Sequence, residues 1–155
     1  MELRSHQTEC VNRIRTHFKN ENRALVKMFC GSGKSFIIYH ALLEFGKNLS
    51  VVVVPSINLI TQFNRDYLLD KTKNEYNKKC FNRKFKLLTI CSKNELNNSD
   101  FEFATEDDDI SNFLKQKNDK IVLITYQSLE KLINIVKRNQ IEINLLCFDE
   151  AHHIY

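Results

Sequence analysis

The chain has 155 residues, the length of one domain, and its 43% of hydrophobic residues is enough for a packed core. The net charge of +4 excludes a polybasic coat for nucleic acid, although the stretch 71–86 carries seven Lys or Arg against one acid, a local net of +6. Such a stretch either attracts phosphates or is simply a solvated loop.

The cysteines and the first residues indicate where the protein works. The five cysteines are scattered and form no CxxC pair, which is typical of a reducing compartment rather than of a zinc site. Met1 is followed at once by Glu2 and Arg4, without a signal-peptide pattern. The longest apolar runs, such as Val51 to Val54, are far shorter than the roughly 20 residues that span a bilayer. We therefore expect an intracellular protein, cytoplasmic, nuclear or in a viral factory, and no membrane partner.

Short apolar runs alternate with helical patterns along the chain. In order, the sequence predicts helix 7–18, strand 24–29, helix 35–45, strand 50–54, helix 57–69, strand 85–91, a helix after the acidic run 107–109, strand 121–125, helix 127–137 and strand 145–149. The valine run is unbroken, as in a strand that is buried on both faces. This alternation predicts an α/β fold, with a mostly parallel sheet flanked by helices.

The segment MFCGSGKS, from Met28 to Ser35, lies between a predicted strand and a predicted helix. Its glycines let backbone N–H groups turn toward phosphate oxygens, and the start of a helix favours the same anion. Lys34 supplies a charge for the β and γ phosphates, and the hydroxyl of Ser35 suits Mg²⁺. The general motif has glycine where Met28 stands. The residues expected to bind ATP are Cys30, Gly31, Ser32, Gly33, Lys34 and Ser35.

Two acids, Asp149 and Glu150, follow the last apolar run. A carboxylate at the carboxyl end of a parallel strand reaches the crevice where ligands bind. Asp149 is expected to hold Mg²⁺ and Glu150 to orient or deprotonate the attacking water, so that Lys34, Asp149 and Glu150 form the catalytic set. Alone, such a pair would more often be a solvated loop, and the assignment depends on the phosphate loop.

Together, MFCGSGKS and the later DEAHH, Asp149 to His153, resemble motifs I and II of superfamily-two helicases, where methionine at the position of Met28 is usual. LRSHQ, Leu3 to Gln7, resembles the LRPYQ-like opening of these domains, which implies that Gln7 reads adenine. The DEAH-type form resembles the restriction-enzyme-like and viral branch more than the DEAD-box RNA branch. The resemblance implies that residues 1–155 are a RecA-like P-loop domain that binds ATP and Mg²⁺.

Two further segments resemble the motifs that line the nucleic-acid track of the same lobe. They are VVVVPSINLITQF, 51–63, and ITYQSL, 124–129. The resemblance implies contacts to DNA or RNA through Pro55, Ser56, Thr125 and Gln127. Ordinary loops after strands remain the alternative.

The chain stops just after the acidic pair, before the motif III strand and the second RecA-like lobe that the family has next. That lobe carries the arginine finger, which contributes on the order of 10³–10⁵ in rate. The resemblance therefore implies a sheet with an unfilled centre and a weak ATPase. The expected function is the ATP-binding lobe of a nucleic-acid helicase. The alternatives are a double-stranded DNA translocase subunit of the restriction or remodelling type and a non-catalytic nucleotide-binding relic.

Overall fold

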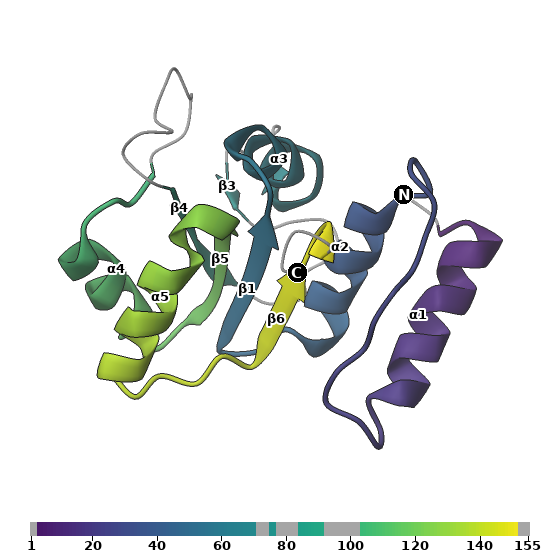
Figure 1. Ribbon diagram of the computed structural model, residues 1–155, viewed down its shortest axis with the longest axis horizontal. Helices are drawn as coiled ribbons and strands as arrows, with labels where there is room; N and C mark the ends of the chain where they lie inside the picture. The colour runs from purple at the N-terminus through teal and green to yellow at the C-terminus, as the bar shows by residue number, and fades with distance from the viewer. Residues whose placement is uncertain (1–2, 71–74, 77–83, 92–102, 152–155) are drawn as a thin grey trace.

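The computed structural model describes residues 3–70, 75–76, 84–91 and 103–151. Four parallel strands form the sheet in the order β4–β5–β1–β6 (Figure 1). Their bounds are β1 Leu49–Val54, β4 Phe85–Ile90, β5 Asp119–Thr125 and β6 Leu145–Phe148. A short antiparallel pair, β2 Leu69–Asp70 and β3 Glu75–Tyr76, stands apart from this sheet. The predicted α/β class with a mostly parallel sheet is confirmed.

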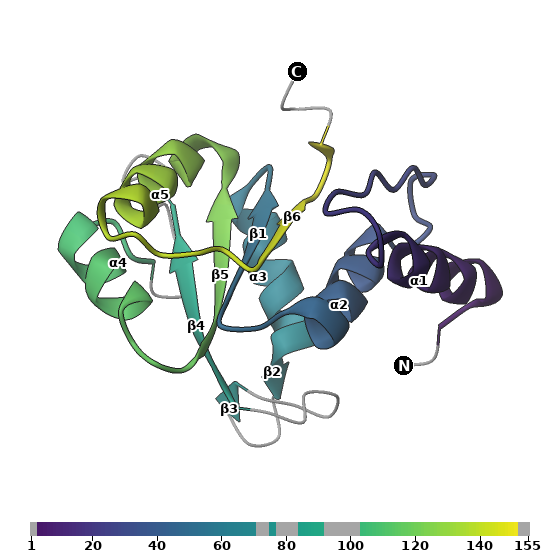
Figure 2. The same ribbon diagram turned by 90° about the horizontal axis from the view of Figure 1, so that it is seen from below.

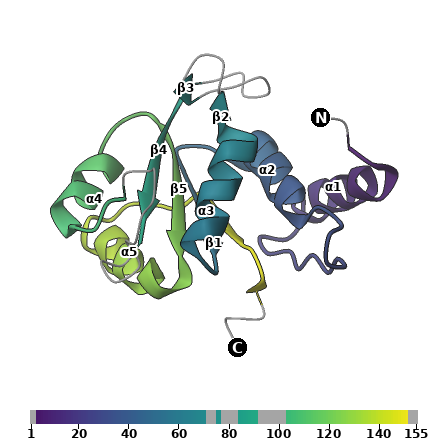
Figure 3. The same ribbon diagram turned by 90° about the horizontal axis from the view of Figure 1, so that it is seen from above.

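Helices cover both faces of the sheet (Figure 2). Their bounds are α1 Ser5–His17, α2 Lys34–Phe45, α3 Ile57–Phe63, α4 Asp107–Leu114 and α5 Tyr126–Arg138, with a π-helical turn η1 Asn64–Leu68 after α3. The core residues of α2 and α3 pack on one face and those of α4 and α5 on the other. Helix α1 lies outside α2 and contacts it through Val11, Ile14 and Ile37 (Figure 3). No helix in these described ranges is long and apolar enough to cross a membrane.

The valine run of β1 explains why the sheet is buried on both faces. Val52 and Val54 pack toward α2 and α3, whereas Val51 and Val53 pack toward α4 and α5. All four are at most 2% exposed, because successive side chains of a strand point to opposite faces. An unbroken apolar run is therefore what this position requires.

The predicted strand over 24–29 is wrong. This segment has no regular secondary structure, because a cavity separates it from β6, the strand at the edge of the sheet that faces it. A cavity of about 660 Å³ lies between the segment, α2 and β6, and Leu25 on its wall is 73% exposed.

Two features singled out in the sequence fall largely outside the described residues. The basic stretch 71–86 is described only at 75–76 and 84–86, and His152 and His153 are not described. The electrostatic attraction expected from the basic stretch stays a prediction.

Candidate nucleotide-binding site

The phosphate loop depends on two glycines with left-handed backbone. Gly31 has φ 75° and Gly33 has φ 90°, a region that residues with a side chain rarely adopt. At Gly33 the space is also closed, because an added Cβ would lie 2.4 Å from Nε2 of Gln7. Ser32 closes the turn by donating its backbone N–H (3.2 Å) and its hydroxyl (2.6 Å) to the carbonyl of Phe29. Gly33 then caps α2, so that the first N–H groups of this helix face the loop.

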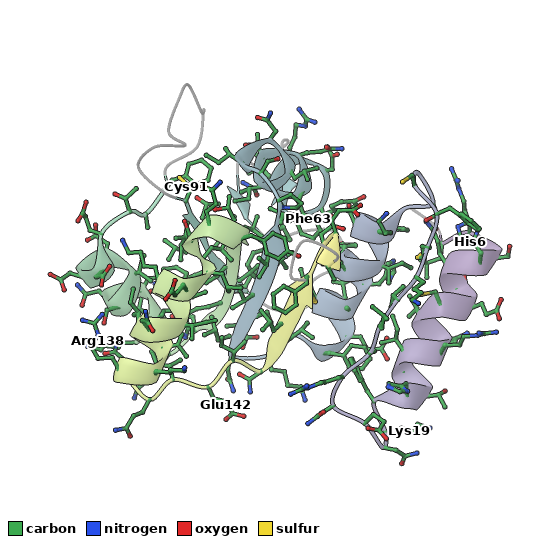
Figure 4. All side chains as sticks on the ribbon, viewed as in Figure 1. His6, Lys19, Phe63, Cys91, Arg138 and Glu142 are labelled. Atoms are coloured by element: carbon green, nitrogen blue, oxygen red, sulfur yellow. The ribbon has the colours of Figure 1, made fainter. Side chains whose placement is uncertain are left out.

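Helix α1 holds the loop from outside. Gln7 is 5% exposed, and its Nε2 donates to the Ser32 carbonyl at 3.0 Å while its Oε1 accepts from the Arg4 N–H at 2.9 Å. His6, labelled in Figure 4, places its Nε2 3.2 Å from the same Ser32 carbonyl. Both Nε2 and Oε1 of Gln7 thus already form hydrogen bonds within the protein. The adenine contact expected of Gln7 stays a prediction.

The acidic pair lies at the same edge of the sheet as the phosphate loop. Asp149 follows β6 and is 8% exposed, and its N–H donates to the Val53 carbonyl at 2.9 Å. Glu150 has φ 54°, and its Oε1 lies 3.0 Å from Nζ of Lys34. The sequence predicted that Lys34, Asp149 and Glu150 lie at the same edge of the sheet, and the structure places them there. Their chemical roles stay predictions.

Burial and neighbouring charges shift the pKa values of this cluster. The pKa of Asp149 is raised by burial and then by the charge of Glu150, while the Glu150 N–H and the Lys34 charge lower it. The hydrogen bond to Glu150 raises the pKa of Lys34, which therefore keeps its proton. A divalent cation at Asp149 would favour the ionised carboxylate.

These residues fit ATP with Mg²⁺. Asp149 is a hard oxygen ligand, the half-buried Ser35 brings a hydroxyl at the start of α2, and Lys34 brings a positive charge to the same edge. The left-handed glycines bend the loop before α2 as phosphate binding requires. No group of three or more His, Cys, Asp or Glu side chains that could hold a metal ion occurs in the described part of the chain.

The predicted nucleic-acid residues meet at this edge, but with different exposure. Val54 pairs with Thr125 in the sheet, so the loops after β1 and β5 are neighbours. Pro55 and Ser56 are half-buried and Gln127 is exposed. Thr125, however, is fully buried, and its hydroxyl lies 3.5 Å from the hydroxyl of Ser128. Its side chain is thus turned away from any surface that a polymer could contact.

Sequence reasoning missed Tyr126. The hydroxyl of this half-buried residue donates to the backbone carbonyl of Asp149 at 2.7 Å, and its ring stacks on Phe148 with centroids 6.1 Å apart. Burial, together with the charges of Asp149 and Glu150, raises the pKa of Tyr126 to about 12. The sequence held no signal for this contact, because the two residues lie 23 positions apart.

The fold and site define an α/β domain of the RecA-like type with a phosphate loop. A family model described as "Type III restriction enzyme, res subunit" matches residues 1–155, so the chain belongs to this family. It has the fold of a superfamily-two helicase lobe. The DEAH-type and viral assignments remain unsupported predictions.

A solved structure gives the same fold. It is a nuclease-deletion mutant of the Type ISP restriction-modification enzyme LlaGI in complex with a DNA substrate mimic, with a TM-score of 0.68 and 23% identity. The match covers 98% of this chain and 15% of the LlaGI chain, so the present sequence spans a small part of that enzyme. The comparison with curated protein sequences gave no match.

Proposed function

We propose that this chain is the ATP-binding lobe of an ATP-dependent motor that acts on DNA. The observation that carries the proposal is the 3.0 Å contact between Lys34 and Glu150, which joins the phosphate loop to the acidic pair across 116 positions of sequence. Membership of a restriction-enzyme family supports a motor rather than a relic that only binds nucleotide.

Each residue has a distinct part in the proposed chemistry. Lys34 and the loop N–H groups bind the phosphates of ATP, and Ser35 and Asp149 hold the Mg²⁺ that neutralises phosphate charge. Glu150 accepts a proton from, or orients, the attacking water. A second RecA-like lobe would complete the site with an arginine, so the present chain alone should hydrolyse ATP slowly.

The polymer is proposed to be DNA and to cross the loops after β1 and β5. The LlaGI structure, which shares the fold, contains a DNA substrate mimic. On the present chain, Pro55, Ser56 and Gln127 lie at that edge with exposed or half-exposed surface. Amides and hydroxyls there can hold phosphates without reading bases, which suits a motor that steps along any sequence.

The ATP site is tested by Lys34→Ala in the intact protein, with Lys47→Ala as the control. Lys47 is exposed just beyond the carboxyl end of α2, away from the phosphate loop. Its replacement by alanine removes one positive charge, as Lys34→Ala does. We expect the affinity for a fluorescent ATP analogue to fall more than about tenfold in Lys34→Ala only, since one charge-assisted phosphate contact is lost. Unchanged affinity would refute the proposed site.

A second candidate is translocation along duplex DNA without strand separation, which the restriction-enzyme family favours. A translocase would displace a triplex-forming strand from duplex DNA in an ATP-dependent manner but leave a forked duplex paired. A helicase would separate the fork. The two assays, run on the same preparation, discriminate the candidates.

A further inference from the structure

A tyrosine hydroxyl attaches the acidic pair to helix α5. Tyr126 is the first residue of α5, and its hydroxyl donates to the backbone carbonyl of Asp149 at 2.7 Å. That carbonyl belongs to the peptide unit that joins Asp149 to Glu150. The N–H of the same peptide unit donates to Oδ1 of Asp149 at 3.0 Å. Both polar groups of this one peptide are therefore held, one by α5 and one by the metal-binding carboxylate of the proposed site.

The orientation of this peptide decides where the Glu150 side chain leaves the backbone. Glu150 has φ 54°, a conformation that is uncommon for a residue with a side chain and persists only where the surroundings impose it. The Tyr126 hydroxyl bonds the carbonyl of this turn, and Lys34 contacts the Glu150 carboxylate. In the proposed mechanism Lys34 binds phosphate. The bond from the Tyr126 hydroxyl to the Asp149 carbonyl does not involve Lys34 and is kept when Lys34 binds phosphate.

The position of the Tyr126 ring is fixed by its neighbours in the core. It stacks on Phe148, the last residue of β6, with an interplanar angle of 24°. Both residues pack against the buried cluster on the α4 and α5 side of the sheet. The hydroxyl therefore reaches Asp149 from a ring whose position is set by the core.

We infer that Tyr126 is a positioning residue, whose hydroxyl fixes the Asp149–Glu150 peptide and so aims the Glu150 carboxylate at the attacking water. The inference rests on the proposed ATPase function. Tyr126 acts through Glu150 and does not itself touch the reacting atoms.

The test is Tyr126→Phe in the intact protein, because phenylalanine keeps the ring and removes the hydroxyl alone. We expect kcat for ATP hydrolysis to fall about tenfold, since small misplacements of a reacting group cost up to about 10²-fold. The KM for ATP and the affinity for a fluorescent ATP analogue should stay within about twofold, because the phosphate loop is untouched. The control is Tyr39→Phe, which removes a hydroxyl from a buried tyrosine of α2 on the other face of the sheet.

A double-mutant cycle with Glu150→Gln separates positioning from a general effect on folding. If Tyr126 acts through Glu150, adding Tyr126→Phe to Glu150→Gln should cause no further loss of rate. A full additional tenfold loss, an equal loss in Tyr39→Phe, or a wild-type kcat in Tyr126→Phe would each overturn the inference. If instead Lys34→Ala leaves nucleotide affinity unchanged, the proposed ATP site has failed, and the inference falls with it.

Discussion

The ammonium group of Lys34 forms an ion pair with the carboxylate of Glu150 in the same site. The Lys34 and Glu150 side chains are 25% and 33% exposed, so their ion pair is partly solvated and contributes little to stability. In the proposed site, phosphate binding would exchange Glu150 for phosphate oxygens around Lys34. Glu150 would thereby be released toward the water that it is proposed to activate.

This exchange predicts how Glu150→Gln behaves. Removing the carboxylate removes a competitor for Lys34, so the affinity for ATP should be unchanged or higher, while hydrolysis falls by about 10²–10⁴-fold through loss of the base. Equilibrium binding and steady-state hydrolysis measure the two effects separately. Glu142→Gln is the control, since Glu142 is exposed on the loop before β6 (Figure 4). Hydrolysis at the wild-type rate in Glu150→Gln would show that another group is the base.

At the same scale, the sequence predicted the phosphate loop and the acidic pair but not the contacts that hold them. Residue types and spacing were enough to predict that Lys34 and Glu150 share one edge, although only Glu150 follows a strand and Lys34 is placed by the loop before α2. The burial of Thr125 was missed although the hydroxyl of Ser128, three positions away, lies beside its own. The burial of Gln7 could not be read in this way either, because its partner Ser32 lies 25 positions away. Hydrogen-bond partners of that separation are set by packing rather than by local pattern.

At the scale of elements, the carboxylate of Asp107 on α4 forms ion pairs with two residues of α5. Asp107, in the first turn of α4, lies 3.1 Å from both Nζ of Lys131 and Nη2 of Arg138 on α5. Figure 4 shows Arg138 near the end of α5 that lies beside α4. Hydrogen bonds from Lys131 and then Arg138 lower the pKa of Asp107 below its usual value. The ionised form is thus favoured in the folded chain.

Asp107→Asn should therefore lower the melting temperature at neutral pH and lose this effect in acid. Because the folded pKa is lowered, the stabilisation is present above the ordinary carboxyl pKa and disappears as the pH falls through the lowered value. The effect should be small and should shrink in high salt, since Asp107 is exposed. Asp108→Asn is the control, because it shares the first turn of α4 and its helix-dipole effect. Equal melting curves for the two variants across pH would contradict the prediction.

Element positions were predicted well wherever an element carries its own periodicity. The helix predicted over 127–137 is α5, Tyr126–Arg138, and the strand predicted over 121–125 is the carboxyl-terminal part of β5. The segment 24–29 has a suitable apolar pattern, yet a strand needs a hydrogen-bonded neighbour, which no local pattern reveals. Similarly, the helix predicted over 57–69 changes to a π-helical turn at Asn64, a fully buried residue. Such a change depends on tertiary packing rather than on residue spacing.

Among the described strands, β6 lies at one edge of the sheet, and Leu146 on it is 40% exposed. Open edges pair readily with other chains, and lysine on an edge opposes such pairing. Leu146→Lys should therefore reduce concentration-dependent association while leaving the melting temperature within a few degrees of wild type. Asn134→Lys, on the exposed side of α5, controls for the added charge. Sedimentation of the three proteins over a concentration series is the measurement, and equal association in all three would contradict the expectation.

The direction of the strands also limits the form that such association takes. Two copies joined through β6 across a twofold axis would pair antiparallel, and the contact would use up the β6 edge of both copies, so it could not repeat through β6. The opposite edge of the sheet is β4, which runs parallel to β6. A copy that offers β4 to the β6 of its neighbour would leave a fresh β6 at the far end. That contact repeats without closing, so among the described strands a β4-to-β6 contact has a route to filament growth that a twofold contact through β6 lacks.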